Sequence, residues 1–500
     1  MARIINYLFL IILALSSCTA SKDAFEPGAK YPPSQLREDY ELFRNILQES
    51  HPSLYWYTTK DSLDYYFNKG FEQIKDSMSE PAFKTLLSYV ITKIDCGHTA
   101  AKFSKAYGRF LDTAKLQSFP LSLKLWGDTM VVTANLNRKD SILKRGVVIK
   151  SINGHSQEEL RDSLFNYVIT DGYSLNGKYQ SLSTGFSFAN WYKNVYGLPD
   201  SFALEYIDTL GVSRRSQVPL YDFKNDTMNR WGFTVNRKPG DKNKERPQLV
   251  FFSSTNLQLD TALSTAYMSL QTFDRGNHLK RFFKQSFKTM DENNIKHLVI
   301  DVRSNGGGDA GLSSLLTRYL IDKKFKLADS LYAVTRSSKY DKYISKSWMY
   351  HMLMVFITKK REDGKYHFGY FERHYFKPKK NHHFDGDVYI LIGGNSFSAT
   401  TLFAGFLKGQ KNITLVGEET GGGYYGNTAW VIEEVTLPNT KTRFTLPKFR
   451  LVIDKNREKN GRGVIPDVWS QPTTEAIRKG IDFKSQKTRE LIETRSTQSK

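Results

Sequence analysis

Cysteine is scarce in this sequence. The 500 residues include only two, Cys18 and Cys96, so at most one intrachain disulfide is possible and a disulfide-held scaffold is excluded. The apolar run at residues 7–15 follows Arg3 and is too short to cross a membrane as a mature helix. Residues 1–18 are therefore interpreted as a signal peptide rather than as part of the fold.

The end of the signal carries a specific pattern. Leu15-Ser16-Ser17-Cys18 resembles the lipobox of bacterial lipoproteins, in which the cysteine is lipidated and becomes the new N-terminus. The alternative is a plain secretory signal cleaved near Ala20. The lipobox resemblance implies a protein that is lipid-anchored through Cys18 to a membrane of the bacterial cell envelope, expected to be the outer membrane, on its periplasmic or surface side. Cys96 would then remain as a free thiol.

Acidic residues are too few to balance the basic ones. The sequence has 72 Lys and Arg against 51 Asp and Glu, a net charge of +21 at pH 7. Such an excess favours anionic neighbours such as lipid head groups, envelope polymers or acidic substrates, with nucleic acid as the usual alternative. Because the basic residues are spread through many segments, we interpret them as a solvated surface and expect no nucleic-acid partner.

Residues 34–117 show a helical pattern. After a polar tether (19–33), apolar residues recur at helical spacing in three successive segments, and Ser34 is expected to cap the first. Gly97 suits a left-handed end to the third segment, which places His98 at a helix exit. A lone histidine after a helix is more often structural than catalytic.

Residues 118–221 change to a β pattern. Apolar residues alternate in the first segments, and a strand at 147–152 closes at the turn Asn153-Gly154. A Leu-Lys-x-Gly sequence before this strand and the Ile-Asn-Gly turn after it resemble the second half of a PDZ domain. PDZ modules take a peptide as an added strand and clamp its C-terminal carboxylate. Because the carboxylate-binding loop is not found here, the resemblance implies the fold without that pocket.

A strand–glycine–helix junction stands out at residues 388–423. A buried apolar strand (388–392) breaks at Gly393-Gly394, and Ser396 and Ser398 precede a helical pattern. A serine on such a turn exposes its hydroxyl beside the first N–H groups of the helix, which suit a developing oxyanion. An isolated serine at a helix start is more often only a cap.

A second junction of the same kind follows the strand at 297–302. Its glycines Gly306, Gly308 and Gly311 match the dinucleotide pattern GxGxxG. However, it lies deep in the chain, and no acidic residue closes a second parallel strand about 20 residues further on. We therefore set the nucleotide interpretation aside and predict no cofactor.

An aromatic, lysine-rich insertion at 332–385 separates the two junctions. It is expected to form a lid or one wall of a cleft. Its adjacent His382 and His383, followed by Asp385, could suggest a metal. Because adjacent side chains rarely converge on one ion and no third ligand is evident, we predict no metal site.

Four separate motifs now coincide in one order. They are Asp95-Cys96-Gly97-His98-Thr99, residues 301–308, Ser396-Phe397-Ser398-Ala399 with the glycine turn 417–423, and Gly463-Val464-Ile465-Pro466-Asp467. In this order they resemble the tail-specific, or C-terminal-processing, serine protease family, and the resemblance covers most of the mature chain. It implies a crotonase-like core of repeated ββα units and a nucleophile at the serine before alanine, which here is Ser398.

The two branches of that family differ in their base. One branch uses a lysine in the glycine turn, and that position is Gly423 here, so the Ser–Lys dyad is absent. The other branch resembles the tricorn core and takes a histidine from the N-terminal helical region, which matches His98. The resemblance thus implies Ser398 as nucleophile and His98 as general base and then acid. The oxyanion would lie between the N–H groups of Gly307 and Ala399.

Two residues depart from the tricorn-like branch. That branch has a serine immediately before its histidine, where this chain has Gly97. It also has an orienting glutamate three residues before the Gly-Val motif, and counting back from Gly463 gives Asn460. An amide can hold an imidazole tautomer but stabilises the imidazolium less than a carboxylate does. The third catalytic member therefore stays open between Asn460 and Glu458.

Together these inferences predict an α/β chain with a crotonase-like protease core, an N-terminal helical domain and a PDZ-like β-rich domain. The predicted parts are signal peptide 1–18, tether 19–33, helical domain 34–117, PDZ-like domain 118–221, linker 222–247, catalytic core 248–472, and C-terminal helix and tail 473–500, with fraying expected from about residue 481. The predicted function is an exported serine-type endopeptidase that cleaves peptides or unfolded protein segments through an acyl-enzyme. The alternative is a catalytically inactive envelope peptide-binding protein of the same fold.

Overall fold

The computed structural model describes residues 25–225 and 254–498. The predicted signal peptide with Cys18, the start of the tether and nearly all of the linker (222–247) lie outside the described residues. Within the described ranges, no helix is both long and apolar enough to cross a membrane.

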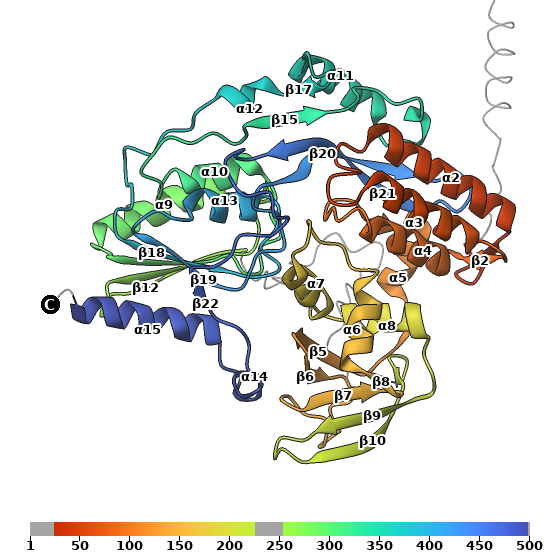
Figure 1. Cartoon of the computed structure of the whole chain (residues 1–500). Coiled ribbons are helices and arrows are strands. Elements are labelled where there is room, and N and C mark those ends of the chain that lie inside the picture. The colour runs from red at the N-terminus through yellow and green to blue at the C-terminus, as the bar shows by residue number, and fades with distance from the viewer. Residues whose placement is uncertain (1–24, 226–253, 499–500) are drawn as a thin grey trace, which may run out of the picture.

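The N-terminal part is helical, as predicted (Figure 1). It contains α2 (Pro33–Ser50), α3 (Lys60–Glu72), α4 (Glu80–Thr92) and α5 (Lys105–Thr113), with the short strands β1 (Lys30–Tyr31), β2 (Met78–Ser79) and β3 (Ala101–Lys102). The apolar faces of α2, α3 and α4 share one core, to which Phe43, Phe67 and Phe83 contribute fully buried rings. The helical spacing read from the sequence is confirmed.

The ends of these helices differ from the prediction. The expectation that Ser34 caps α2 is wrong, because Pro32 stands at the N-cap and Pro33 is the first helical residue, where a missing N–H is tolerated. The expectation that Gly97 adopts the left-handed conformation is also wrong. Asp95, with φ of 54°, makes that turn two residues earlier.

The second part is an antiparallel sheet in the order β10-β9-β7-β6-β5, with β8 paired to β7. Its elements are β5 (Leu121–Trp126), β6 (Thr129–Asn135), β7 (Val148–Ile152), β8 (His155–Ser156), β9 (Ser201–Ile207) and β10 (Ser213–Pro219), with α6 (Gln157–Phe165), α7 (Leu175–Leu182) and α8 (Ser187–Tyr196) packed against the sheet. A small separate ladder joins β4 (Gln117–Ser118) to β11 (Tyr221–Asp222). The predicted turn is present, with positive φ at Asn153 and Gly154.

One edge of this sheet is covered by α7. The Leu125 N–H donates to Ser183 Oγ at 2.9 Å, and Lys124 Nζ donates to Gln180 Oε1 at 2.6 Å. A peptide therefore cannot add as a strand at the β5 edge without displacing α7, and β10 forms the opposite edge. The PDZ resemblance of this part stays a prediction.

The third part is built on a sheet in the order β12-β13-β14-β18-β19-β22. Its strands are β12 (Thr255–Asp260), β13 (Thr265–Leu270), β14 (His297–Asp301), β18 (Asp387–Ile392), β19 (Ile413–Gly417) and β22 (Val468–Trp469), all parallel from β13 onward. The two apolar strands that precede the glycine junctions are thus β14 and β18, and they are neighbours. Because parallel strands end at the same edge, the two junctions meet there.

Helices cover both faces of this sheet (Figure 1). One face carries α9 (Leu279–Glu292), α10 (Ala310–Thr317) and α13 (Ala399–Leu407), which share an apolar core with the strands. The other carries α15 (Phe483–Gln498), which follows the short α14 (Thr474–Lys479). Such a layered arrangement buries the near-continuous apolar runs of parallel strands on both sides.

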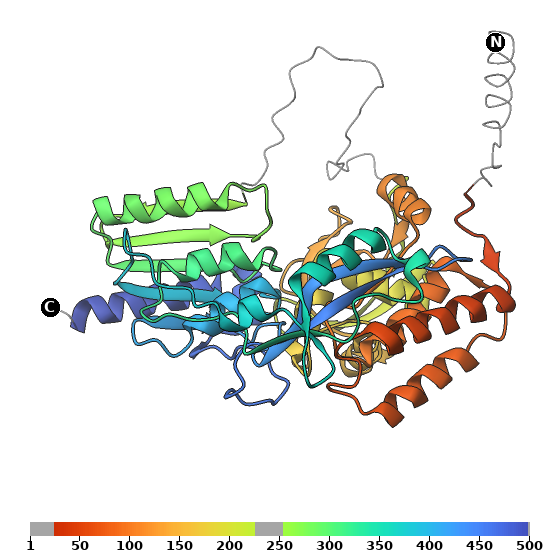
Figure 2. The same ribbon diagram turned by 90° about the horizontal axis from the view of Figure 1, so that it is seen from above.

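A further sheet, in the order β16-β17-β15-β21-β20, links the parts. It contains β15 (Ser330–Ala333), β16 (Lys359–Lys360), β17 (Tyr366–His367), β20 (Gly426–Thr436) and β21 (Arg443–Val452), and the insertion adds η1 (Asp341–Tyr343), α11 (Ser347–Ile357) and α12 (Gly369–Arg373). Figure 2 shows the β20–β21 hairpin running from the third part to the helical part. There Phe444 and Leu446 enter the core of α2–α4, and β21 pairs with β3.

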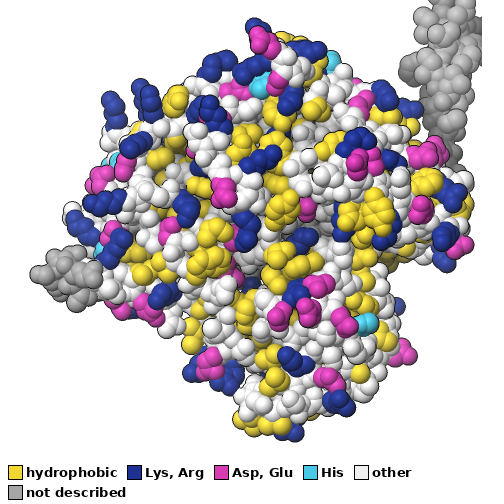
Figure 3. Space-filling view, viewed as in Figure 1, with side chains coloured by type: hydrophobic (Ala, Val, Ile, Leu, Met, Phe, Trp, Pro, Cys, Tyr) yellow, Lys and Arg dark blue, Asp and Glu magenta, His cyan; other side chains and the backbone are white. Residues whose placement is uncertain are grey.

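The surface carries charges of both signs. On the face shown in Figure 3, Lys and Arg side chains are interspersed with Asp and Glu over all three parts. Exposed ion pairs occur on the surface of the described part of the chain, such as Arg489 with Glu493. On this face the basic excess is spread rather than gathered into one patch.

The charged C-terminal segment is ordered, so the expectation that it frays from about residue 481 is wrong. Ile492 of α15 is fully buried against Tyr389, Leu391 and Val416 of the sheet. Lys484 Nζ lies 2.8 Å from Glu418 Oε2, with both side chains 5% exposed, and it also donates to the Ile392 carbonyl at 3.0 Å. A buried ion pair, invisible in the composition, fixes this helix.

Replacing Lys484 by methionine should lower the free energy of unfolding by about 3–5 kcal/mol, because Glu418 would be left buried without its counter-ion. The matched control is Lys487→Met, which removes an exposed lysine of the same helix and should change stability by less than about 0.5 kcal/mol. Urea unfolding of both variants measures the difference. Equal stability of the two variants would contradict the prediction.

Candidate active site

Ser398 stands at the junction of β18 and α13 in a strained backbone conformation. As the N-cap of α13 it has φ of 54° and ψ of −121°, a backbone conformation that residues other than glycine seldom adopt. The neighbouring Ser396 is fully buried, and its hydroxyl donates to the Val302 carbonyl at 2.9 Å. Ser396 is therefore a structural residue, and Ser398 presents the accessible hydroxyl.

The glycine junction after β14 packs directly on Ser398. A β-carbon at Gly307, which has φ of 107°, would lie 2.8 Å from Ser398 Cβ and 3.0 Å from the Ala399 nitrogen. Only glycine fits this approach. The Gly307 N–H, predicted as an oxyanion donor, instead donates to Asn305 Oδ1 at 2.9 Å.

Two other N–H groups are free beside Ser398. In the part of the chain that the structure describes, the N–H groups of Gly308 and Ala399 have no acceptor. Both residues line the cavity next to the serine. These two donors, rather than that of Gly307, suit an oxyanion at this position.

His98 reaches Ser398 because the β20–β21 hairpin holds its backbone. The Thr445 hydroxyl donates to the His98 carbonyl at 2.7 Å, and the Thr445 N–H donates to the Ala100 carbonyl at 3.0 Å. The imidazole Nε2 then lies 3.1 Å from Ser398 Oγ, although the two residues are 300 positions apart. The structure thus brings together the predicted nucleophile and the predicted base.

Gly97 makes room for the ring that packs on this imidazole. The Phe397 ring centroid lies 4.6 Å from that of His98. A β-carbon at position 97 would lie 2.5 Å from Phe397 Cζ, so a larger residue would displace the ring. Gly97, which departs from the family pattern, therefore leaves the space that the Phe397 ring occupies.

A carboxylate that the sequence analysis missed lies behind His98. Asp171 is 2% exposed, and its Oδ1 lies 3.9 Å from His98 Nδ1. It accepts the Gly97 N–H at 2.8 Å and the Gly423 N–H at 3.4 Å. His98 Nδ1 has no hydrogen-bond partner among the described residues, so Asp171 is its facing charge.

Burial and this carboxylate act on His98 in opposite directions. Burial lowers the pKa of the imidazole below its ordinary value of 6.5, and the charge of Asp171 raises it, with burial the larger effect. The net result is an imidazole that is neutral at pH 7 and able to accept a proton.

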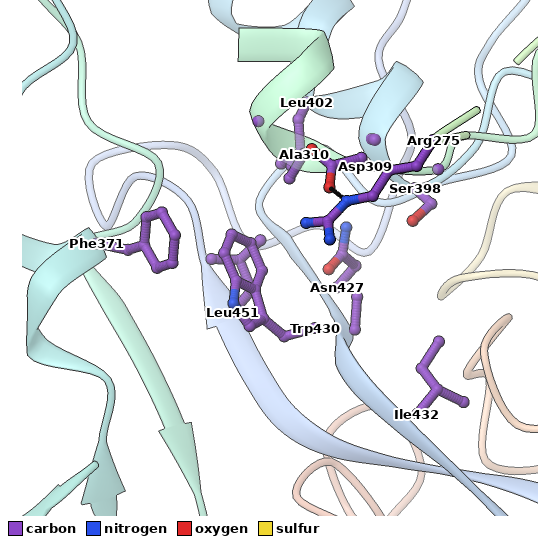
Figure 4. A pocket seen from close by; sticks show the side chains of 14 residues that line it. Arg275, Asp309, Ala310, Phe371, Ser398, Leu402, Asn427, Trp430, Ile432 and Leu451 are labelled. Atoms are coloured by element: carbon purple, nitrogen blue, oxygen red, sulfur yellow. Dashed lines mark hydrogen bonds and ion pairs between the residues drawn. The ribbon is translucent and has the colours of Figure 1, made fainter. Parts of the chain in front are cut away.

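A cavity of about 410 Å³ opens beside Ser398 (Figure 4). Its walls are mostly apolar, from Leu402, Trp430, Leu451 and Phe371 among others. Phe371 belongs to the insertion, so the expectation that the insertion forms one wall of a cleft is confirmed. Arg275 Nε donates to Asp309 Oδ2 at 2.6 Å beside the cavity. A hydroxyl, an imidazole and free N–H donors beside a cavity are the parts needed for acyl transfer.

The comparisons with known proteins concern the third part of the chain and the overall fold. Residues 264–470 match the model described as peptidase family S41. The S41 domain here denotes this matched segment, residues 264–470, which is similar to that family. The matched range contains Ser398, Gly307 and Gly308, whereas His98 and Asp171 are contributed by the parts that precede the matched residues.

Solved structures extend the likeness to nearly the whole chain. Mature CPAF complexed with lactacystin is 14% identical, with 92% of this chain and 98% of that chain covered and a TM-score of 0.63. Mature CPAF alone is 14% identical, with 89% of this chain and 94% of that chain covered and a TM-score of 0.59. A CPAF mutant is 13% identical, with the same coverages and a TM-score of 0.60. At such identity the likeness establishes the fold, and the predicted α/β protease fold class is confirmed. No curated protein matches the sequence.

The two residues predicted as third catalytic member lie elsewhere on the S41 domain. Asn460 and Glu458 are exposed, and the Asn460 Nδ2 donates to Glu458 Oε2 at 3.1 Å. Neither forms a hydrogen bond with His98 within the described ranges. The adjacent Gly461 carbonyl instead accepts the N–H of Tyr173, which anchors the loop that carries Asp171.

Sequence reasoning had little chance of finding Asp171. It lies in the β-rich part, outside the S41 domain and 227 positions before Ser398 (398 minus 171). An Asp-Gly pair between apolar segments is typical of a turn and carries no catalytic signal. Only the fold reveals that the loop is tied to the glycine turn of the domain, where the Ser174 hydroxyl donates to the Thr420 carbonyl at 2.8 Å.

The position of the family's dyad lysine has no space for a side chain. A β-carbon at Gly423 would lie 2.5 Å from the Gly426 carbonyl oxygen. Lys408, the nearest lysine after Ser398 in sequence, is bound to Asp467 Oδ1 at 2.8 Å. A lysine at position 423 would therefore require the backbone at Gly426 to move.

The adjacent histidines of the insertion pair with different partners. His382 Nδ1 lies 2.8 Å from Asp291 Oδ2, and His383 Nδ1 lies 2.8 Å from Asp385 Oδ1. In the described part of the chain, no group of three or more His, Cys, Asp or Glu side chains is placed to hold a metal.

The contact between Gly97 and Phe397 can be tested by a double-mutant cycle. Gly97→Ala should lower the free energy of unfolding by ~1–3 kcal/mol, because the new methyl group meets the Phe397 ring. In a Phe397→Ala background the same substitution should have less than half that effect, because the ring is absent. Urea unfolding of the four proteins measures this. Additive effects would show that the two residues do not contact each other.

Proposed function

We propose that this protein is a serine-type endopeptidase with Ser398 as nucleophile, His98 as general base and Asp171 as the residue that orients the base. The observation that carries the proposal is the 3.1 Å approach of His98 Nε2 to Ser398 Oγ, with a buried carboxylate behind the imidazole. A nucleophile that contacts a base, with an orienting group on the other side of that base, is the arrangement of an activated serine. The substrates are peptides or unfolded protein segments.

The reaction follows from these positions. Ser398 Oγ attacks the substrate carbonyl carbon while its proton moves to His98 Nε2, and the carbonyl oxygen becomes an oxyanion held by the N–H groups of Ala399 and Gly308. The imidazolium then gives the proton to the departing amine, and an acyl-enzyme remains. Water, deprotonated by His98, attacks the acyl carbon and releases the acid product, which restores the Ser398 hydroxyl.

Asp171 takes the part that the sequence analysis left open between Asn460 and Glu458. A carboxylate facing Nδ1 favours the tautomer that carries its proton on that nitrogen, which leaves Nε2 free to accept from serine. It also stabilises the imidazolium once it forms. The separation of 3.9 Å is longer than a hydrogen bond, and catalytic hydrogen bonds often tighten only when substrate is bound.

The rival function is an inactive envelope protein that binds peptides with the same fold. Its support in the sequence was the pair of departures at Gly97 and Asn460. Both have a physical account: Gly97 leaves space for Phe397, and Asp171 supplies a carboxylate that Asn460 does not.

A fluorophosphonate probe separates the two functions. Wild-type protein should be labelled covalently at Ser398, Ser398→Ala should not be labelled, and His98→Ala should react at least about a hundredfold more slowly for want of a base. A folded wild-type protein that takes no label favours the rival.

The pH dependence tests the roles of His98 and Asp171. Because burial lowers the pKa of His98, kcat/KM should rise with pH through one ionisation below 6.5, where the base loses its proton. Asp171→Asn removes the charge that raises this pKa, so the midpoint should move further down, and kcat should fall by about 10²–10⁴. Asn460→Ala is the control and should keep both the midpoint and kcat. The reverse pattern would return the third role to Asn460.

We also propose that the protein is exported and anchored to the bacterial envelope by lipid on Cys18. The support is the N-terminal sequence alone, in which the short apolar run ends in Leu15-Ser16-Ser17-Cys18. The basic surface would add attraction to anionic head groups.

Metabolic labelling with palmitate tests the anchor. Wild-type protein should incorporate label and fractionate with membranes, whereas Cys18→Ser should do neither. Cys96→Ser, at the buried thiol, is the matched control and should still be labelled. Unlabelled wild-type protein found free in the periplasm would support the plain secretory signal instead.

A further inference from the structure

Asn427 has an unusual environment in the wall of the cavity beside Ser398. It lies on β20, is 1% exposed, and neither its Nδ2 nor its Oδ1 has a hydrogen-bond partner among the described residues. Buried polar side chains are nearly always paired, and leaving one unpaired costs about 1–3 kcal/mol. A buried, unpaired amide in a cavity wall indicates a ligand group that completes it.

The Asn427 side chain is directed toward the reacting centre. Figure 4 shows the Asn427 side chain pointing toward Ser398 and Arg275. The β20–β21 pairing shifts register between Ala429 and Ile432, and within this bulge Trp430 has φ of 84°. Bulges that re-aim side chains are common beside active sites. The strained segment thus shapes the same wall that carries the amide.

The other groups of the cavity narrow the chemistry. Leu402, Leu451 and Trp430 offer apolar contact. The charge of Arg275 is neutralised by Asp309 at 2.6 Å, so the cavity does not demand a charged occupant. It suits a side chain with an apolar stem and an uncharged polar end.

We propose, on the basis of the endopeptidase function above, that this cavity receives the side chain of the residue whose carbonyl Ser398 attacks, and that Asn427 selects a primary amide there. The cavity includes Gly308 and Ala399, the donors assigned to that carbonyl oxygen, so the side chain next to it enters the cavity. Glutamine, with its two-methylene stem, is the favoured residue.

The choice of an amide follows from donors and acceptors. The unpaired atoms of Asn427 are one NH₂ donor and one carbonyl acceptor, and a second primary amide can accept from the first and donate to the second at the same time. A carboxylate only accepts, an ammonium only donates, and a thioether is a weak acceptor. A hydroxyl has only one oxygen, which would have to pair with both Nδ2 and Oδ1 of Asn427. The primary amide alone among natural side chains pairs both in one contact.

The test compares peptides that differ only at this residue. Glutamine, methionine and glutamate form a matched set of similar length. Wild-type enzyme should cleave after glutamine at least about tenfold more efficiently in kcat/KM than after methionine, because methionine would leave both Asn427 atoms unpaired. Glutamate should also be cleaved less efficiently than glutamine, because its carboxylate faces the Asn427 oxygen. Equal or better cleavage after methionine or glutamate overturns the inference.

Substitution of Asn427 assigns the preference to this residue. In Asn427→Leu the preference for glutamine over methionine should vanish or reverse. In the near-isosteric Asn427→Asp it should persist, because the glutamine NH₂ can donate to a carboxylate that methionine would leave unpaired. Asn256→Leu, at an exposed position of edge strand β12, should keep the wild-type ratio. A ratio that survives in Asn427→Leu overturns the inference. If that variant does not fold, the wild-type ratio alone decides.

Fluorophosphonate labelling separates this inference from the function on which it rests. If Ser398 is not labelled and no peptide is cleaved, the endopeptidase function fails and the inference falls with it. If Ser398 is labelled but the enzyme shows no preference for glutamine, or cleaves none of the three peptides, only the inference is overturned.

Discussion

The buried carboxylate of Asp171 is the constraint on which the arrangement of the site depends. A buried charge is tolerated only when hydrogen bonds replace its lost water. Here the donors are the N–H groups of Gly97, from the helical part, and Gly423, from the S41 domain, while Asp171 itself comes from the β-rich part. The three parts must therefore meet before this charge is accommodated. Asp171, which faces the imidazole, therefore also links the three parts through its hydrogen bonds.

Much of the fold could be predicted from local pattern, because apolar periodicity directly reflects which face of an element is buried. The strands β14 and β18 and the helices α2 to α4 follow from such runs. The C-terminal helix could not be predicted in the same way, because its anchor is the buried Lys484–Glu418 pair and such a lysine resembles any surface lysine in a sequence. Whether a lysine is buried in an ion pair depends on where its partner lies in the fold, and here the partner is 66 positions away in the sequence (484 minus 418).

The site residues also fall into those that local sequence motifs predict and those that only long-range contacts reveal. Ser398 and His98 could be named because short motifs around them resemble a family, and the structure brings them together. Asp171, the engaged N–H of Gly307 and the space that Gly97 leaves for Phe397 depend on contacts between distant segments. Local rules also fail where the cavity is built, at Ser398 and Trp430 with positive φ. Such failures are expected at functional sites, since the surrounding structure holds what the local sequence disfavours.

The 300 positions between His98 and Ser398 have a consequence for the time course of synthesis. At translation rates of about 5–20 residues per second, the serine follows the histidine by about 15–60 s. Throughout this interval the loop of Asp171 lacks its acceptor carbonyls at Thr420 and Gly421, and the His98 carbonyl lacks Thr445 for longer still. The nascent chain can fold its helices and its first sheet early, but nucleophile and base meet only after most of the polypeptide has been made.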